Sequence, residues 1–291
     1  MKAILAACAL VAGCAVVEPP AAPSSTPPAS GPMSIPVEVM KPPGDGPFAA
    51  VVMMHDCSGL GPRSSGSPKR WAKILVDEGY VVVLPDSFST RGFPGGVCTD
   101  HSGRRSEVRA IVRARDAYEA LDYARSLPYV DRARIGIMGG SHGGASTLAT
   151  LGVRRALDAP RFVAGVALYP GCNPDAPYRP GAPLLILAGE KDDWTPAERC
   201  ARLAERARNA GHAVAIKVYP GAHHGFDSAS PLRHVEARVN ASSPTGRGAT
   251  TGGDPVAWAD SIREVRAFFA KHLSMPLSMP LGESPGGPRA R

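Results

Sequence analysis

Short apolar runs alternate with longer amphipathic stretches along most of the chain, and this alternation predicts its secondary structure. Apolar runs predict strands at 35–40, 48–54, 80–84, 134–138, 162–168, 183–188 and 213–219. Apolar residues at helical spacing predict helices at 68–78, 106–127, 141–153, 196–209 and 254–273. Strands that alternate with helices of this length form a mostly parallel central sheet with helices on both faces. We therefore predict one α/β domain at residues 34–274.

Three segments lack this alternation. Residues 15–33 are rich in Pro, Ala and Ser, and residues 275–291 are rich in Pro, Gly and Ser. Neither composition can bury a core, so we predict a flexible tether and a disordered tail. Residues 228–253 form a long polar insertion before the last predicted helix, and the pattern assigns this insertion no role.

The chain begins with the features of an export signal. Met1 and Lys2 precede a short apolar run, and small residues then lead to Cys14. The run is too short to cross a membrane. Residues 1–14 resemble a bacterial lipobox, in which Cys14 would be lipidated, and the alternative is a plain secretory signal. Both predict an exported protein, and the lipobox predicts a periplasmic or cell-envelope lipoprotein held at the membrane by its lipid.

The charge is moderately basic, because 33 Lys and Arg residues outnumber 26 Asp and Glu residues. Several arginines between residues 104 and 125 are interleaved with acidic residues, a pattern that we interpret as a solvated helix face. No basic stripe interleaved with aromatic residues and no nucleic-acid motif accompanies the charge, so we do not predict nucleic acid as a partner.

Four cysteines follow the signal segment: Cys57, Cys98, Cys172 and Cys200. An even number of cysteines in an oxidising compartment predicts disulfide bonds. The pairs Cys57–Cys98 and Cys172–Cys200 each lie on successive predicted loops at the same end of the sheet, and we predict these two bonds. The alternative is a set of four buried thiols.

The sequence Gly139-Gly140-Ser141-His142-Gly143 lies between a predicted strand and a predicted helix. A G-x-S-x-G sequence in this context predicts a nucleophile elbow, a tight turn that lifts the serine Oγ above the sheet edge. Glycines flank the serine because a side chain there would clash with the strand or the helix. The helix N-terminus would then point at the reacting carbonyl. The alternative is a glycine-rich turn with an incidental serine.

A serine nucleophile needs a base to take its proton, and the base needs an orienting carboxylate. Both are expected after later strands, in the order Ser, Asp, His. Asp192 and Asp193 follow one such strand, and His223 and His224 follow the next. Asp193 would equally suit a helix cap. The adjacent histidines would alternatively bind a metal, but no third ligand is evident, and we predict no metal site.

From about residue 35 to residue 273 the chain resembles the dienelactone hydrolase family of α/β-hydrolases. The resemblance is carried by His55-Asp56-Cys57-Ser58-Gly59 and by residues 79–87, 134–143, 189–196 and 219–226. It implies the α/β-hydrolase fold. The founding enzymes of the family carry cysteine at the elbow, whereas this chain has Ser141, as do many relatives that are general esterases.

The resemblance also implies the acid and the base. The family pattern G-x-x-D-x-x-x-P falls on Gly189, Asp192 and Pro196, which implies Asp192 as the acid. The family's H-G-F sequence falls on His224-Gly225-Phe226, which implies His224 as the base.

An oxyanion hole needs two backbone N–H groups. We expect one from His142, the residue after the nucleophile, and the resemblance implies Cys57 for the other. Asp56 beside it is interpreted as a loop hydrogen-bond acceptor.

The candidates for the substrate pocket are Arg91, Tyr169, Trp194 and Phe226. Of these, an unpaired Arg91 would bind a substrate carboxylate, whereas a solvated or ion-paired Arg91 would not.

Together these observations predict a serine hydrolase that cleaves a small-molecule carboxylic ester through an acyl-enzyme, without metal or cofactor. A peptidase or a thioesterase would use the same three residues. A surface lipoprotein that binds a ligand without catalysis is the alternative from another class. The sequence indicates neither the ester nor the oligomeric state.

Overall fold

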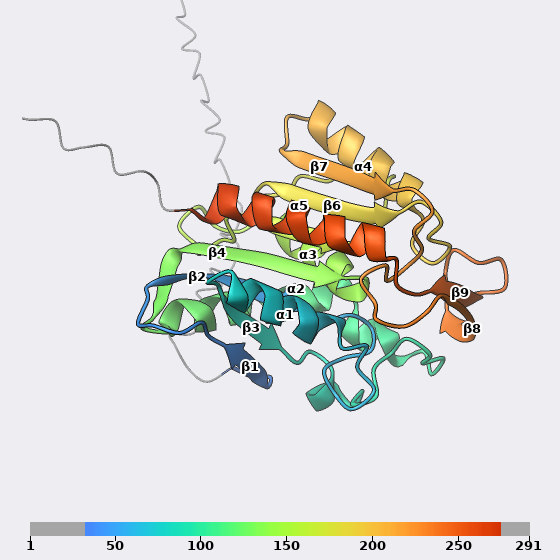
Figure 1. Cartoon of the computed structure of the whole chain (residues 1–291), viewed down its shortest axis with the longest axis horizontal. Helices are drawn as coiled ribbons and strands as arrows, with labels where there is room; N and C mark the ends of the chain where they lie inside the picture. The colour runs from blue at the N-terminus through green and yellow to red at the C-terminus, as the bar shows by residue number, and fades with distance from the viewer. Residues whose placement is uncertain (1–32, 275–291) are drawn as a thin grey trace, which may run out of the picture. The chain divides into compact units, whose positions relative to one another are not determined.

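The computed structural model describes residues 33–274 and has a seven-stranded sheet at its centre (Figure 1). The strands lie in the order β1-β3-β2-β4-β5-β6-β7. β1 pairs with β3 in the antiparallel direction, and every other neighbouring pair is parallel. The strands are β1 Val37–Met40, β2 Phe48–Met54, β3 Val81–Pro85, β4 Val130–Gly140, β5 Gly165–Leu168, β6 Leu184–Gly189 and β7 Val214–Tyr219.

Helices cover both faces of this sheet. α1 Ser67–Asp77 and α5 Pro255–Leu273 pack on one face, and α2 Ala110–Ser126, α3 His142–Gly152 and α4 Ala197–Asn209 pack on the other (Figure 1). Successive side chains of a strand point to opposite faces. Within β2, Val51 and Met53 therefore join the core under α1 and α5, and Val52 and Met54 join the core under α2, α3 and α4. The predicted fold class is confirmed.

The helix predicted at 106–127 begins later than expected. A 3-10 turn, η2 Arg104–Val108, precedes it, and Arg109 interrupts the helical geometry with φ −56° and ψ 156°. Val108 is fully buried in a small cluster with Phe88 and the Cys57–Cys98 pair, and this packing separates the turn from the helix. A second short turn, η1 Ser89–Arg91, lies in the same region.

The polar insertion at 228–253 contains a hairpin that the sequence did not predict. β8 Arg233–Val239 and β9 Arg247–Thr251 pair with each other as a separate antiparallel sheet. Polar and apolar residues alternate from His234 to Val239, which is the pattern of a strand, but the run lies in a long polar segment and none of its residues is fully buried. An isolated bridge between Thr251 and His224 joins the hairpin to the loop that follows β7.

The predictions for residues 1–14 and 275–291, and for most of 15–33, lie outside the described residues. Among the helices that the structure describes, none has the length and apolar character needed to cross a membrane.

Candidate active site

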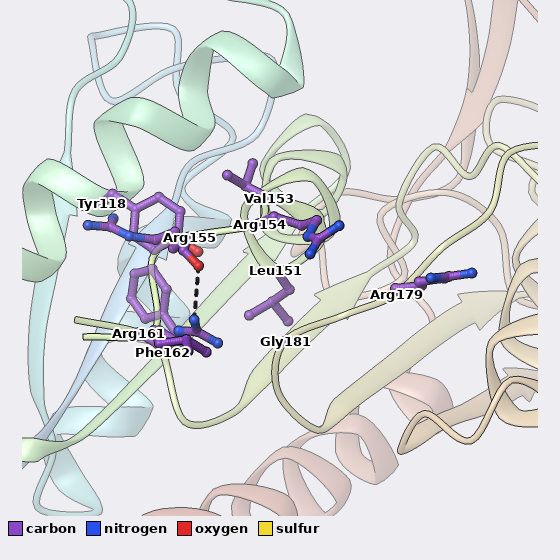
Figure 2. A pocket seen from close by; sticks show the side chains of 10 residues that line it. Tyr118, Leu151, Val153, Arg154, Arg155, Arg161, Phe162, Arg179 and Gly181 are labelled. Carbon is purple, nitrogen blue, oxygen red and sulfur yellow. Dashed lines mark hydrogen bonds between the residues drawn. The ribbon is translucent and has the colours of Figure 1, made fainter. Parts of the chain in front are cut away.

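One hollow of about 220 Å³ lies near the starts of β5 and β6 (Figure 2). Its wall combines apolar residues with Arg154, Arg155, Arg161 and Arg179. Arg161 is used structurally, because its guanidinium donates to the carbonyl of Arg155 at 3.0 Å. The wall holds no Ser, Cys, His, Asp or Glu, so it offers no nucleophile with a base.

A second cavity, of about 410 Å³, opens at the carboxyl ends of the strands and contains Ser141 and His224 in its wall. Ser141 follows β4 directly and adopts φ 53°, an unusual value for a residue with a side chain. The close packing of the turn explains why glycines stand two residues before and after the serine. A Cβ at Gly139 would lie 2.5 Å from the backbone of Gly143, and a Cβ at Gly143 would collide with the carbonyl oxygen of Met54. The turn therefore has the local geometry predicted for an elbow.

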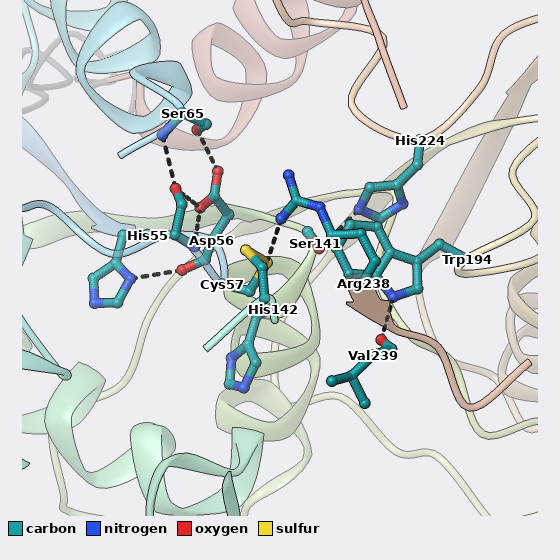
Figure 3. Close-up of a disulfide and its surroundings, with 12 residues drawn as sticks. His55, Asp56, Cys57, Ser65, Ser141, His142, Trp194, His224, Arg238 and Val239 are labelled. Atoms are coloured by element: carbon teal, nitrogen blue, oxygen red, sulfur yellow. Dashed lines mark hydrogen bonds between the residues drawn. A yellow bond between two sulfur atoms is a disulfide. The ribbon is translucent and has the colours of Figure 1, made fainter. Parts of the chain in front are cut away.

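Three loops bring Ser141, His224 and Asp192 together. His224 Nε2 lies 2.9 Å from Ser141 Oγ, and His224 Nδ1 lies 2.8 Å from Asp192 Oδ2 (Figure 3 shows the serine and the imidazole). Because a carboxylate only accepts, Nδ1 carries the proton and Nε2 is free to accept from the serine hydroxyl. All three side chains are buried, so water competes weakly for these bonds.

The structure separates the two aspartates that the sequence left in competition. Asp192 also accepts from the backbone N–H groups of Trp194 and Thr195 through Oδ1, at 2.9 and 2.8 Å, which fixes its rotamer. Asp193 instead accepts from the backbone and hydroxyl of Thr250 in β9. Asp193 therefore does not cap α4, whose N-cap is Pro196.

The two histidines are separated in the same way. His224 is the one that reaches Ser141, and in the described part of the chain His223 Nδ1 has no hydrogen-bond partner. Within residues 33–274, no group of three or more metal-binding side chains includes either ring.

Both predicted disulfides, Cys57–Cys98 and Cys172–Cys200, are present. The first fixes the loop after β2, and the backbone N–H of Val97 donates to the Cys57 carbonyl at 2.7 Å beside it. Within the described residues, the backbone N–H groups of Cys57 and His142 have no protein acceptor. Cys57 and Ser141 line the same cavity, and His142 directly follows Ser141.

The geometry of the site agrees with a comparison of the whole chain with known families. A model described as the dienelactone hydrolase family matches residues 35–273. The chain belongs to the dienelactone hydrolase family. A protein of Methylorubrum extorquens, provisionally named as a carboxymethylenebutenolidase, is 28% identical over 207 residues, which cover 66% of this chain and 68% of that protein.

Solved structures of low sequence identity share the fold. A crystal structure from Klebsiella pneumoniae, provisionally assigned as a dienelactone hydrolase, has a TM-score of 0.58 at 20% identity and covers 81% of this chain and 99% of its own. A thermophilic esterase from Thermogutta terrifontis has a TM-score of 0.59 at 17% identity, over 82% and 91% of the two chains. The fold is thus that of the α/β-hydrolases, and as a dienelactone hydrolase family member the chain is a hydrolase of ester bonds.

Two of the four pocket candidates line the cavity of this dienelactone hydrolase family member, and two do not. Tyr169 and Trp194 form part of its wall. Phe226 is fully buried against Tyr169 and Tyr219 and belongs to the core. Arg91 is held by a two-pronged ion pair with Asp116, both bonds 2.7 Å, and this hydrogen bonding raises its pKa. Arg91 is therefore a paired residue rather than a substrate-binding one.

Asp56 accepts hydrogen bonds within its own loop, as expected. Its carboxylate takes them from the backbone N–H and the hydroxyl of Ser58, at 2.7 and 2.5 Å, and from the hydroxyl of Ser65 at 2.5 Å (Figure 3). These bonds fold the loop after β2 back on itself and support the adjacent Cys57.

Arg238, on β8, is a pocket residue that the sequence did not reveal. Its guanidinium lies 5.1 Å from the ring of Trp194, and its Nη1 lies 3.9 Å from Cys57 Sγ (Figure 3). Burial lowers its pKa. In the sequence, Arg238 stands in the long polar insertion before the last helix, and the pattern of that insertion gave no indication that this side chain lines the pocket.

Asp227 is a second unexpected residue. This buried carboxylate accepts from the Tyr169 hydroxyl at 2.7 Å and from Trp71 Nε1 at 2.8 Å, and Ser67 also bonds to it. Burial, followed by the charge of Asp227, raises the pKa of Tyr169. Because the Tyr169 ring packs edge-on against the His224 ring at 4.8 Å, Asp227 supports the loop on which His224 stands.

Proposed function

We propose that this dienelactone hydrolase family member hydrolyses carboxylic esters through a Ser-His-Asp triad of Ser141, His224 and Asp192. The observation that supports the proposal most is the continuous pair of hydrogen bonds, 2.9 and 2.8 Å long, from the hydroxyl through the imidazole to the carboxylate. A serine at an elbow, an imidazole within hydrogen-bond distance of its hydroxyl and a fixed carboxylate are the parts that nucleophilic acyl transfer requires.

In the first half-reaction, Ser141 Oγ attacks the carbonyl carbon of the ester, and His224 Nε2 takes the hydroxyl proton. The Asp192 carboxylate stabilises the imidazolium that forms. The carbonyl oxygen becomes an oxyanion, which the N–H groups of Cys57 and His142 bind. When the tetrahedral intermediate collapses, the C–O bond to the alcohol breaks, and the leaving alkoxide takes the proton from His224.

In the second half-reaction, water attacks the acyl carbon and gives a proton to His224. The bond between the acyl group and Ser141 then breaks, and the serine takes that proton back. The products are a carboxylic acid and the free enzyme. Each proton that His224 accepts is returned, so these residues complete the cycle without a cofactor.

Replacing the nucleophile tests this function. We expect Ser141→Ala to lower kcat for p-nitrophenyl acetate by about a thousandfold or more. A fluorophosphonate probe should label the wild-type protein and leave Ser141→Ala unlabelled, because only an activated serine reacts. Retention of turnover or of labelling in the variant would refute the assignment.

A substrate panel tests the chemical class. Esters, thioesters and peptides of matched acyl group should be compared by kcat/KM on the wild-type protein. We expect esters to be the best substrates. A preference for thioesters or peptides would replace the proposed specificity while keeping the triad.

We also propose that the protein is a cell-envelope lipoprotein anchored through Cys14. The two disulfides indicate an exported protein. The small residues before Cys14 favour lipid attachment over simple cleavage. Metabolic labelling with a palmitate analogue should mark the wild-type protein, and the Cys14→Ala variant should remain unmarked. An unlabelled wild-type protein would exclude the anchor.

A further inference from the structure

Arg113 is a fully buried arginine that the proposed mechanism has not used. It lies in the first turn of α2, among the arginines whose spacing predicts a solvated helix face, yet its exposed fraction is 0%. The solvated-face prediction is therefore wrong at this position. Removing a guanidinium from water is costly unless the protein supplies partners, so its surroundings need an explanation.

The two ends of the guanidinium contact two different segments of the candidate site. Nη1 donates to the Nδ1 of His142 at 2.7 Å, and Nη2 donates to the backbone carbonyl of His55 at 2.8 Å. His142 is the residue after Ser141, and His55 lies two residues before Cys57. One rigid fork thus joins the elbow to the loop after β2.

The surrounding rings hold this arrangement in place. The guanidinium of Arg113 lies 4.9 Å from the ring of Phe88, and the same ring packs edge-on against His55 and His142. His55 is itself fixed, because its Nδ1 donates to the Asp56 carbonyl at 2.8 Å and its Nε2 accepts from the Ser87 N–H at 3.1 Å. In Figure 3 the His142 ring extends away from His224, on the side of the elbow opposite the base.

The positive charge of Arg113 has no paired carboxylate. Among residues 33–274, no carboxylate lies within ion-pair distance of it, and the nearby Asp116 is bonded by Arg91 instead. Its Nε also has no hydrogen-bond partner in this part of the chain. Burial lowers the pKa of Arg113 to about 10, so the side chain stays protonated at neutral pH.

We propose that Arg113 is a positioning residue that clamps the two halves of the oxyanion hole and leaves its charge available to the oxyanion that forms there. The proposal rests on the proposed function. The clamp fixes the distance between the N–H groups of Cys57 and His142 by bonding one residue on each side. Arg113 is buried from water and has no ion-pair partner among residues 33–274. A fixed positive charge of this kind favours the state in which a negative charge appears, and it requires no reorganisation when that charge develops.

The test uses a trifluoromethyl ketone, an inhibitor that imitates the oxyanion. Ser141 Oγ adds to its carbonyl carbon, His224 takes the hydroxyl proton, and the ketone oxygen becomes the oxyanion. We expect Arg113→Met to lower kcat for p-nitrophenyl acetate by about a hundredfold and to weaken ketone binding by a similar factor. KM should change by less than about threefold, because the clamp acts on the transition state rather than on the bound ester. Arg113→Lys should recover part of both losses, since it keeps the charge and loses the fork.

The matched control is Arg115→Met, which makes the same substitution at an exposed position two residues along α2. Arg115→Met should leave kcat for p-nitrophenyl acetate and the affinity for the ketone unchanged. A folded Arg113→Met protein with kcat and ketone affinity within twofold of wild type would overturn the proposal. If that variant does not fold, Arg113→Lys decides, and wild-type kcat in a folded Lys variant would overturn the clamp, because one ammonium cannot occupy both Nη positions.

The same experiment separates this inference from the function on which it rests. A wild-type protein that neither hydrolyses the ester nor reacts with a fluorophosphonate would refute both the proposed function and the Arg113 clamp. If the wild-type protein hydrolyses the ester and reacts with the fluorophosphonate, and Arg113→Met keeps the wild-type kcat and ketone affinity, the clamp alone is refuted.

Discussion

His224 Nδ1 donates to the Asp192 carboxylate at 2.8 Å. The neighbouring carboxylate of Asp193 faces the other way and binds Thr250 of the hairpin. Two identical side chains, adjacent in the sequence, thus have separate partners. Only the first can orient the imidazole and stabilise its charged form.

Asparagine substitutions test this division. We expect Asp192→Asn to reduce kcat for p-nitrophenyl acetate by about a thousandfold or more, because an amide can hold the wrong imidazole tautomer and carries no charge. Asp193→Asn keeps an acceptor for Thr250 and should cost less than about tenfold. The reverse order of the two losses would identify Asp193 as the acid.

The lack of space at the elbow gives a prediction about stability. A Cβ at Gly143 would overlap the Met54 carbonyl oxygen, which belongs to a fixed strand. We expect Gly143→Ala to lower the free energy of unfolding by about 1–3 kcal/mol or more, measured by urea denaturation. Gly171→Ala is the control, because a Cβ there would meet only a methyl group of Thr195 at 3.9 Å. Equal stability of the two variants would contradict this account.

The two disulfides should differ in their effect on catalysis. They close segments of 41 and 28 residues, so chain entropy predicts a similar loss of roughly 3–4 kcal/mol when either is removed. Only Cys57–Cys98 holds an amide proposed for the oxyanion hole. The Cys57→Ser/Cys98→Ser protein should therefore lose kcat at a temperature where it remains folded. The matched Cys172→Ser/Cys200→Ser protein should keep its kcat, and a similar loss in both would argue against a local role.

The environment of His142 predicts a dependence of stability on pH. Burial, followed by the Arg113 charge, lowers its pKa from 6.5 to about 3 in the folded protein. Below pH 6.5 the unfolded chain therefore binds a proton that the folded protein does not, and the free energy of unfolding falls as the pH falls toward 3.

Asparagine at this position isolates the effect, since its side-chain oxygen can accept from Arg113 and does not titrate. The loss of unfolding free energy between pH 7 and pH 5 should be smaller in His142→Asn than in wild type, by about 1–2 kcal/mol. Urea denaturation at both pH values measures this difference. Parallel curves for the two proteins would show that His142 protonates as easily folded as unfolded.

Local patterns were sufficient to predict most of the fold and the loops that meet at the site, whereas the choice of Asp192 over Asp193 and of His224 over His223 came from the family resemblance. A strand, a glycine-flanked serine and a helix specify the elbow within a few residues. The parallel order of the strands then places the loops that carry Asp192 and His224 at the same sheet edge. The pairing of Cys57 with Cys98 followed from the same argument.

The remaining features depend on contacts between distant segments, which the sequence pattern does not encode. Arg113 is spaced like a surface residue, and its burial depends on Phe88 and on the loop that covers the start of α2. Arg91 could be identified as paired only once Asp116 was found beside it. The first strand of the hairpin, β8, has no fully buried residue, and the hairpin is held by contacts with loops that come from elsewhere in the chain.

That hairpin contacts three separate loops of the site. The N–H of Val239 donates to the Cys98 carbonyl at 3.0 Å, the carbonyl of Val239 accepts from Trp194 Nε1 at 2.9 Å, and the N–H of Gly252 donates to the His224 carbonyl at 3.1 Å. A single short peptide therefore borders the cavity from the Cys57–Cys98 disulfide to the loop of His224, while the loops at the edge of the sheet carry the proposed triad. Exchange of this peptide for others of different length offers protein engineers a route to new substrate preference that leaves the catalytic framework in place.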